Sequence, residues 1–329
     1  MALIAWARSV VSTLSDDQGA GGCGPAASRP RRPAAGRVRV ALAILALTLT
    51  AALSMSAAAS SPSAPKGAGE TAGFTDETTI VSPGKPKDVF GTGLALSSDG
   101  TTMIVGAPRD NAYRGAAWIF KKRGTGWQPQ KLVGDLKEPG EFGQSVALSG
   151  DGRIAVIGAP NDDDHEGSAW VYRSVGGGTW VGTKLSPRGE EGDPSFGYSV
   201  AVSADGSMVL VGGPDDDKRA FGGETGRGAA WTFVRSGNRW VQQGSKITTP
   251  SSAGRGNFGW SVSISGDGST ALVGSPDVSD DNGAAWLHRW SGSKWQRLGG
   301  RIFFAQADKP VLHFGSRFGF SVGLSYDGA

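Results

Sequence analysis

The feature that most constrains the fold is a stretch of nineteen residues that the chain repeats with small changes. In the copy at residues 142–160, FGQSVALSGDGRIAVIGAP, a Phe-Gly pair opens the stretch, an Asp-Gly pair divides it and Gly-Ala-Pro closes it. Copies begin at residues 90, 142, 196, 258 and 318, with spacings of 52, 54, 62 and 60 residues. Periods of this length are typical of propeller blades or stacked repeats, so the sequence predicts a repeat architecture.

Each copy reads as two β-strands. Apolar side chains alternate with small or polar ones, as in Val146 and Leu148 against Ser145 and Ala147, which is the period of a strand. Asp-Gly between two such runs predicts a hairpin whose two turn residues both have positive φ. This turn chemistry explains the regular aspartates without catalysis or metal binding. They are Asp99, Asp151, Asp205 and Asp267.

A second hairpin is expected after each copy. Segments such as GAAWIF and GSAWVY carry a tryptophan, and a second tryptophan follows nine or ten residues later, across a Gly-containing turn. The pairs are Trp118 and Trp127, Trp170 and Trp180, Trp231 and Trp240, and Trp286 and Trp295. Each period is therefore predicted to be a four-stranded antiparallel meander, and such sheets stacked radially form a β-propeller. We interpret the tryptophans as core residues that cover small side chains of the next sheet; the alternative is a platform for sugar stacking.

Phe-Gly and Gly-Ala-Pro at this spacing identify a resemblance to the FG-GAP repeat, as found in the β-propeller of integrin alpha subunits and in secreted bacterial proteins. The resemblance covers residues 90–329. It implies an all-β propeller used for extracellular binding or adhesion rather than catalysis. Four full blades plus a fifth that is only begun are fewer than the seven of the integrin propeller, so we expect an incomplete, open ring with TTIVS at residues 78–82 in the place of a closing strand.

The first 59 residues differ in kind from the repeats. RPRRPAAGRVR precedes the apolar run VALAILALTLTAAL and a small-residue stretch, the order of a secretory signal peptide. A membrane anchor is the alternative, but about 20 apolar residues are needed to span a bilayer. We expect cleavage after Ala59, a flexible linker over residues 60–76 and the propeller repeats over residues 77–329. The product would be secreted or associated with the cell surface, without a stable membrane span.

Charge and cysteine content narrow the function further. The leader holds six of the 33 Lys and Arg but two of the 30 Asp and Glu, which leaves 27 against 28 in the mature chain. A near-neutral chain gives no basis for nucleic-acid binding through a basic surface. The single cysteine, Cys23, lies in the leader, so neither disulfides nor thiol chemistry are expected in the exported protein.

No catalytic motif is present. His165, His288 and His313 lie in unrelated contexts without metal-ligand spacing. The chain has no G-x-S-x-G, H-E-x-x-H, Walker or Rossmann signature. The sequence therefore predicts a protein that is not an enzyme and that needs no cofactor.

Acidic residues gather on one predicted face. In an up-and-down meander, the loops from strand two to three and from strand four to the next strand one lie at the same end of the sheets. Those loops hold 19 of the 28 acids against ten Lys and Arg. They serve either solubility or recognition. The candidate ligand-binding residues are Asp162, Asp163, Asp164, Glu166, Asp215, Asp216, Asp217, Glu224, Asp280 and Asp281.

One loop differs from the others in length. Residues 215–227 form a thirteen-residue connection where the other repeats have six, which makes it the first choice for a specificity element. The resemblance to integrins also raises calcium, but no loop here has the D-x-D-x-D-G spacing of that family. We expect weak, salt-sensitive Ca²⁺ attraction only. Its expected contacts are Asp162, Asp164, Asp215, Asp217, Asp280 and Asp281.

Three functions are compatible with these patterns. The favoured one is an extracellular binding or adhesion module that recognises a protein or glycan through the acidic loops. A carbohydrate-active enzyme or its accessory domain is the second, since paired carboxylates hydrolyse glycosides. A structural spacer is the third. The acids occur in runs such as residues 162–164, which reads as solvated surface rather than as buried, tuned carboxylates.

Overall fold

The computed structural model describes residues 80–328, apart from residues 81, 86, 218–225, 251–253 and 304–315. The chain divides into two units, Met1–Glu77 and Thr78–Ala329, and every described residue belongs to the second. The expected signal peptide, its cleavage site and the linker lie outside the described residues. Within the described part, no helix is long and apolar enough to cross a membrane.

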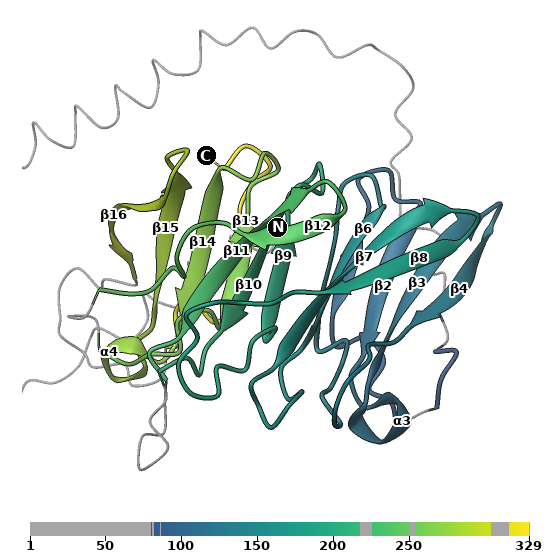
Figure 1. Ribbon diagram of the computed structural model, residues 1–329, viewed down its shortest axis with the longest axis horizontal. Coiled ribbons are helices and arrows are strands. Elements are labelled where there is room, and N and C mark those ends of the chain that lie inside the picture. The colour runs from purple at the N-terminus through teal and green to yellow at the C-terminus, as the bar shows by residue number, and fades with distance from the viewer. Residues whose placement is uncertain are drawn as a thin grey trace, which may run out of the picture. The chain divides into compact units, whose positions relative to one another are not determined.

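The described residues form four antiparallel sheets of four strands, and the strand order in each sheet follows the chain (Figure 1). The predicted all-β repeat of meanders is confirmed, and its sheets have the form of propeller blades. The first sheet contains β1 (Leu94–Leu96), β2 (Thr102–Ala107), β3 (Ala116–Arg123) and β4 (Gly126–Leu132). The second contains β5 (Ser145–Leu148), β6 (Ile154–Ala159), β7 (Ser168–Gly176) and β8 (Thr179–Lys184). The third contains β9 (Ser199–Val202), β10 (Met208–Gly213), β11 (Ala229–Ser236) and β12 (Arg239–Gln242). The fourth contains β13 (Ser261–Ile264), β14 (Thr270–Ser275), β15 (Ala284–Trp290) and β16 (Trp295–Ile302).

Hydrophobic clusters fill the spaces between consecutive sheets. Ile104 and Ile119 of the first sheet pack with Ile157 and Tyr172 of the second, and equivalent clusters join the second to the third and the third to the fourth sheet. All eight paired tryptophans contact these clusters or the one on the outer side of the first sheet, which confirms the core interpretation. Only Trp231 and Trp286 are fully buried. The expected gap in the ring stays a prediction.

The Phe-Gly and Gly-Ala-Pro signatures meet where one sheet packs on the next. A Cβ added to Gly158 of the second sheet would lie 1.9 Å from the carbonyl oxygen of Gly197, which follows Phe196 in the next repeat. Gly106, Gly212 and Gly274 lie equally close to the glycine carbonyl of the Phe-Gly pair in the following repeat. Any side chain at these positions would occupy the space of a neighbouring backbone, so the two signatures are complementary halves of one contact.

The Asp-Gly turns differ from the predicted hairpin type. The glycines have positive φ, for example 65° at Gly152, whereas the aspartates do not, so the expectation of two positive-φ residues was wrong. Instead, the Asp151 carboxylate accepts hydrogen bonds from the Ser149 hydroxyl and from the Arg153 amide. The Ser149 hydroxyl in turn accepts the Ile154 amide. The aspartate is required as an acceptor that closes the turn.

Removing this serine hydroxyl is expected to destabilise the turn. Ser149 is fully buried, and Ser149→Ala would leave the Ile154 amide without its acceptor. We expect a loss of about 1.5 kcal/mol in the free energy of unfolding, measured by urea denaturation. Ser207 is the control, because its hydroxyl also bonds an aspartate of such a turn but is exposed to solvent. Equal losses in Ser149→Ala and Ser207→Ala would contradict this account.

Backbone hydrogen bonds link these turns from one repeat to the next. The Ser98 amide donates to the Gly150 carbonyl at 2.9 Å, and the Gly150 amide donates to the Ala204 carbonyl at 2.8 Å. The row continues from Ala204 to Gly266 and from Gly266 to Tyr326 of the fifth repeat. At this end of the molecule, neighbouring sheets are therefore linked by backbone hydrogen bonds.

Candidate ligand-binding surface

The four sheets present two ends with different chemistry. We call the end with the Asp-Gly turns and the turns between third and fourth strands the turn face. The loop face is the opposite end, formed by the loops between second and third strands and by the connections between repeats. Two short helices, α3 (Asp110–Tyr113) and α4 (Val278–Asp281), belong to such loops and lie at this same end (Figure 1).

The loops of the first three repeats are anchored by ion pairs whose aspartates are buried. Two residues after the proline of each signature stands an aspartate whose carboxylate contacts a lysine at the end of the same sheet. The distances are 2.7 Å for Asp110–Lys131, 2.8 Å for Asp162–Lys184 and 2.5 Å for Asp216–Lys246. The aspartate side chains are at most 7% exposed. The sequence interpretation of solvated acidic runs is therefore wrong for Asp162 and Asp216.

The same carboxylates fix the connections between repeats. Asp162 accepts a hydrogen bond from the Lys137 amide, and Asp216 accepts one from the Glu191 amide, both from the connection that leads into that repeat. The fourth repeat lacks the pair: Val278 stands at the aspartate position and is buried, and Arg301 reaches Ser279 instead. Lysine and aspartate are thus lost together, as expected if the buried carboxylate requires the lysine as its partner.

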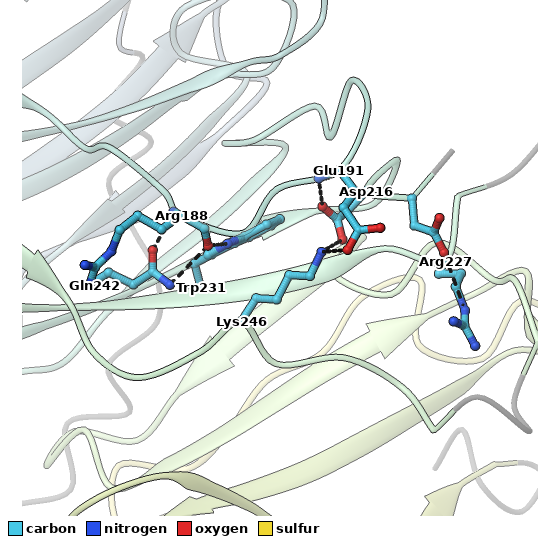
Figure 2. Close-up of polar contacts among 8 residues, drawn as sticks. Arg188, Glu191, Asp216, Arg227, Trp231, Gln242 and Lys246 are labelled. Carbon is cyan, nitrogen blue, oxygen red and sulfur yellow. Dashed lines mark hydrogen bonds and ion pairs between the residues drawn. The ribbon is translucent and has the colours of Figure 1, made fainter. Parts of the chain in front are cut away.

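Figure 2 shows this anchoring in the third repeat. Lys246 extends toward Asp216, and the connection before the repeat is also held at Arg188, whose carbonyl accepts the indole N–H of Trp231 at 3.2 Å. The Gln242 side chain bonds both the amide and the carbonyl of Arg188. Burial raises the pKa of Asp216, and the Lys246 ammonium partly opposes that shift. The connection before the third repeat is therefore attached at two points, through Asp216 at one and through the Trp231 and Gln242 side chains at the other.

The other predicted ligand-binding residues lie in several environments. Asp163 pairs with Lys137, whose hydrogen bond holds the pKa of that carboxyl below its usual value, while Asp164 and Glu166 are exposed. Asp215 accepts the Ser195 hydroxyl at 3.0 Å, and Asp217 pairs with Arg227 at 3.8 Å. Glu224 and the side chains of Asp280 and Asp281 are outside the described residues. The predicted residues that the structure describes therefore do not form one cluster. Those with side-chain partners contact groups of their own loop or of the connection beside it.

A cavity of about 240 Å³ lies at the base of the thirteen-residue loop. Its walls include Glu191, Asp217, Arg227, Lys246 and Thr248, so both signs of charge surround it. Residues 218–225 of that loop are outside the described part. Among the described residues, no group of three or more His, Cys, Asp or Glu side chains is placed to hold a metal ion.

Sequence reasoning missed a row of aromatic rings on the loop face. The residue after Phe-Gly is Tyr198, Trp260 and Phe320 in the third, fourth and fifth repeats, whereas the first two repeats have Thr92 and Gln144. Ring centroids are 4.6 Å apart for Tyr198–Trp260 and 5.5 Å apart for Trp260–Phe320. Aromatic residues at one position of three consecutive repeats were the signal that could have predicted this row.

Charged groups surround the aromatic row. The Arg317 guanidinium lies 5.3 Å from the ring centre of Trp260 and 5.1 Å from that of Phe320, a cation–π arrangement. It also pairs with Asp277 at 2.9 Å. Burial raises the pKa of Tyr198 to about 12, and the carboxylates of Asp215 and Asp277 add to the shift. The phenol therefore stays a hydrogen-bond donor at any physiological pH.

One buried histidine makes stability depend on pH. His288 is 4% exposed, and burial lowers its pKa to about 4 from 6.5. As the pH falls from 6.5 toward 4, the unfolded chain binds a proton at His288, whereas the folded chain stays largely unprotonated there. Stability should decline by about 2 kcal/mol over this window because of this group. His288→Phe should remove that part of the decline in urea titrations at several pH values, and an unchanged decline would contradict the assignment.

The family model agrees with the repeat architecture. The sequence model of the FG-GAP repeat matches residues 130–172 and 240–288. A similar solved structure is hydrazine synthase of Kuenenia stuttgartiensis, with a TM-score of 0.44 and 15% sequence identity. That match covers 70% of this chain and 53% of the other, so the chain spans about half the length of the solved structure it matches.

Proposed function

We propose that this FG-GAP repeat protein is a non-catalytic extracellular module that binds a protein or glycan ligand through its loop face. The observation that carries the proposal is the aromatic row of Tyr198, Trp260 and Phe320, with Arg317 and Asp277 beside it. Tyrosine, tryptophan and arginine are the residues most enriched at the centres of binding interfaces. Trp260 is half-buried and Phe320 is 50% exposed, so the row presents apolar surface to solvent.

The two faces differ in how many of their polar groups already make hydrogen bonds or ion pairs within the protein. On the turn face, backbone groups of successive turns bond each other, and the aspartates of the first four Asp-Gly turns each accept a serine hydroxyl and a backbone amide. On the loop face, buried aspartates hold the loops in place while other acidic side chains remain at the surface. Binding residues commonly lie in loops on a rigid scaffold, which supports the loop face as the recognition surface.

The arrangement favours binding over hydrolysis. The most buried loop carboxylates, Asp162 and Asp216, are each paired with a lysine and bonded to a backbone amide. That geometry supports a loop, because each carboxylate is already held by a lysine and a backbone amide. The acidic excess of the loops favours a ligand surface rich in lysine and arginine, because complementary charge speeds and orients association.

An array of extracellular matrix proteins and glycans, probed with the whole protein, tests this function. We expect retention of at least one ligand, and a loss of roughly thirtyfold in affinity for Trp260→Ala and for Phe320→Ala. Tyr326→Ala is the matched control, since Tyr326 is a 75% exposed aromatic residue on the turn face. Retention of nothing supports a spacer, and turnover of an arrayed glycan supports an enzyme; either outcome contradicts the proposal.

A further inference from the structure

A second cavity, of about 570 Å³, lies between the outer strands of the third and fourth sheets. Its walls come from residues 244–250, which follow β12, from β15 and β16, and from residues 293–294 in the turn between those two strands. This volume is within the usual range of small-molecule sites. It is separate from the aromatic row, so its role is independent of the function proposed above.

A local insertion opens this cavity. Gln242 pairs with Phe233, and Ile247 pairs with Ala230. The chain therefore takes five residues to go from Gln242 to Ile247, whereas the partner strand covers the same distance in three. The two additional residues take the chain out of the sheet near Gly244 and Ser245, both exposed at the rim. The second sheet has no such excursion, because Trp170 to Tyr172 pair with Lys184 to Gly182 in continuous register.

His288 is the unusual residue of the cavity wall. The other three repeats place an aromatic ring at this position: Phe120, Tyr172 and Phe233. All four rings pack edge-on against the phenylalanine of their own Phe-Gly pair. The Tyr172 hydroxyl bonds the Val133 carbonyl, whereas Nδ1 of His288 is buried without a hydrogen-bond partner in the described part of the chain. Internal hydrogen bonding therefore does not explain why a histidine stands at this core position.

The remaining wall residues define the chemistry of a ligand. Lys294 and Arg297 line the cavity, and no described residue that lines it is an aspartate or glutamate. Lys246 also borders the cavity but is engaged by Asp216. Trp295 supplies an aromatic wall, and its ring is held by a hydrogen bond from its indole N–H to the Thr232 hydroxyl at 2.9 Å. The site therefore offers positive charge, one aromatic surface and the edge of the His288 imidazole that lines the cavity.

We propose that this cavity binds a carboxylated sugar, the kind of unit found in uronic-acid glycans. Arg297 and Lys294 hold the carboxylate, Trp295 contacts the sugar ring, and the edge of the His288 imidazole that lines the cavity contacts a ring hydroxyl. A guanidinium binds a carboxylate through two parallel hydrogen bonds, which gives selectivity for the acid over the neutral sugar.

Calorimetric titration of the whole protein with glucuronate tests the site. Glucuronate should bind, and glucose and acetate should each bind about tenfold more weakly, because one lacks the charge and the other lacks the ring. Arg297→Gln should weaken glucuronate binding about tenfold, since it removes a charge-assisted contact at an exposed position. Arg239→Gln is the control, because Arg239 is likewise an exposed arginine close to the second tryptophan of its repeat, but it does not line the cavity.

His288→Phe provides an independent test, because it installs the residue of the third repeat. It should raise the melting temperature and weaken glucuronate binding about tenfold, as expected for a group kept for a ligand rather than for packing. No binding at millimolar glucuronate, equal binding of glucose, or full binding by Arg297→Gln would overturn the proposal. Trp260→Ala should leave this site unchanged, so failure of the loop-face function is distinguishable from failure here.

Discussion

Gly158→Ala is expected to lower the free energy of unfolding by about 3–4 kcal/mol, because overpacking at a rigid contact is strongly destabilising. The new Cβ would lie 1.9 Å from the Gly197 carbonyl oxygen of the next sheet and 2.4 Å from the Ser145 hydroxyl. A backbone atom cannot move aside as a side chain can, so the sheets must separate. Urea denaturation monitored by tryptophan fluorescence measures the loss.

Gly126→Ala is the matched control for that substitution. Gly126 begins β4, and a Cβ there would have its nearest neighbour, the Arg123 carbonyl oxygen, at 3.9 Å. We expect a change within about 0.5 kcal/mol. If Gly158→Ala and Gly126→Ala unfolded at the same urea concentration, the close approach of the two signatures would not hold the sheets together.

Lys184→Met is expected to destabilise the fold by about 3 kcal/mol. The substitution keeps most of the side-chain volume but leaves the fully buried Asp162 carboxylate with only the Lys137 amide as a donor. An unpaired buried charge is far more costly than a missing ion pair. Thermal and urea denaturation at neutral pH give the size of the effect.

The fourth repeat suggests how to rescue that variant. Its buried Val278 occupies the aspartate position. The double variant Asp162→Val/Lys184→Met should therefore recover more than half of the stability lost in Lys184→Met, because an apolar pair can replace a buried ion pair at little cost. If the double variant were less stable than Lys184→Met, the pair would have a role beyond mutual neutralisation.

The fold was predictable because its information is local and repeated. Alternating side chains and turn residues recur in every copy, so β5 and β6 could be placed from residues 142–160 alone. The turn type was misjudged because the decisive contact, from Ser149 to Asp151, depends on side-chain geometry. The serine two residues before each Asp-Gly pair was nevertheless visible in the sequence.

The candidate site was less predictable because burial depends on partners that are distant in sequence. Asp162 and Asp163 are adjacent acids, yet Asp162 is fully buried, because β8 ends with Lys184 beside it, and Asp163 is half-buried. The amino-acid composition of the loop cannot show which of the two aspartates is buried. The aromatic row, by contrast, depends on a repeated position, and a comparison of the residue after each Phe-Gly pair would have revealed it.

Hydrogen–deuterium exchange of the protein with the ligand most strongly retained on the array tests the binding face most directly. If the loop face is the recognition surface, bound ligand should slow exchange at residues 195–198, 257–260 and 316–320, which carry and flank the aromatic row. The turn residues 149–153 and 203–207 should exchange at the same rate with and without ligand. Protection confined to these turns, with none at the aromatic row, would contradict the proposed function.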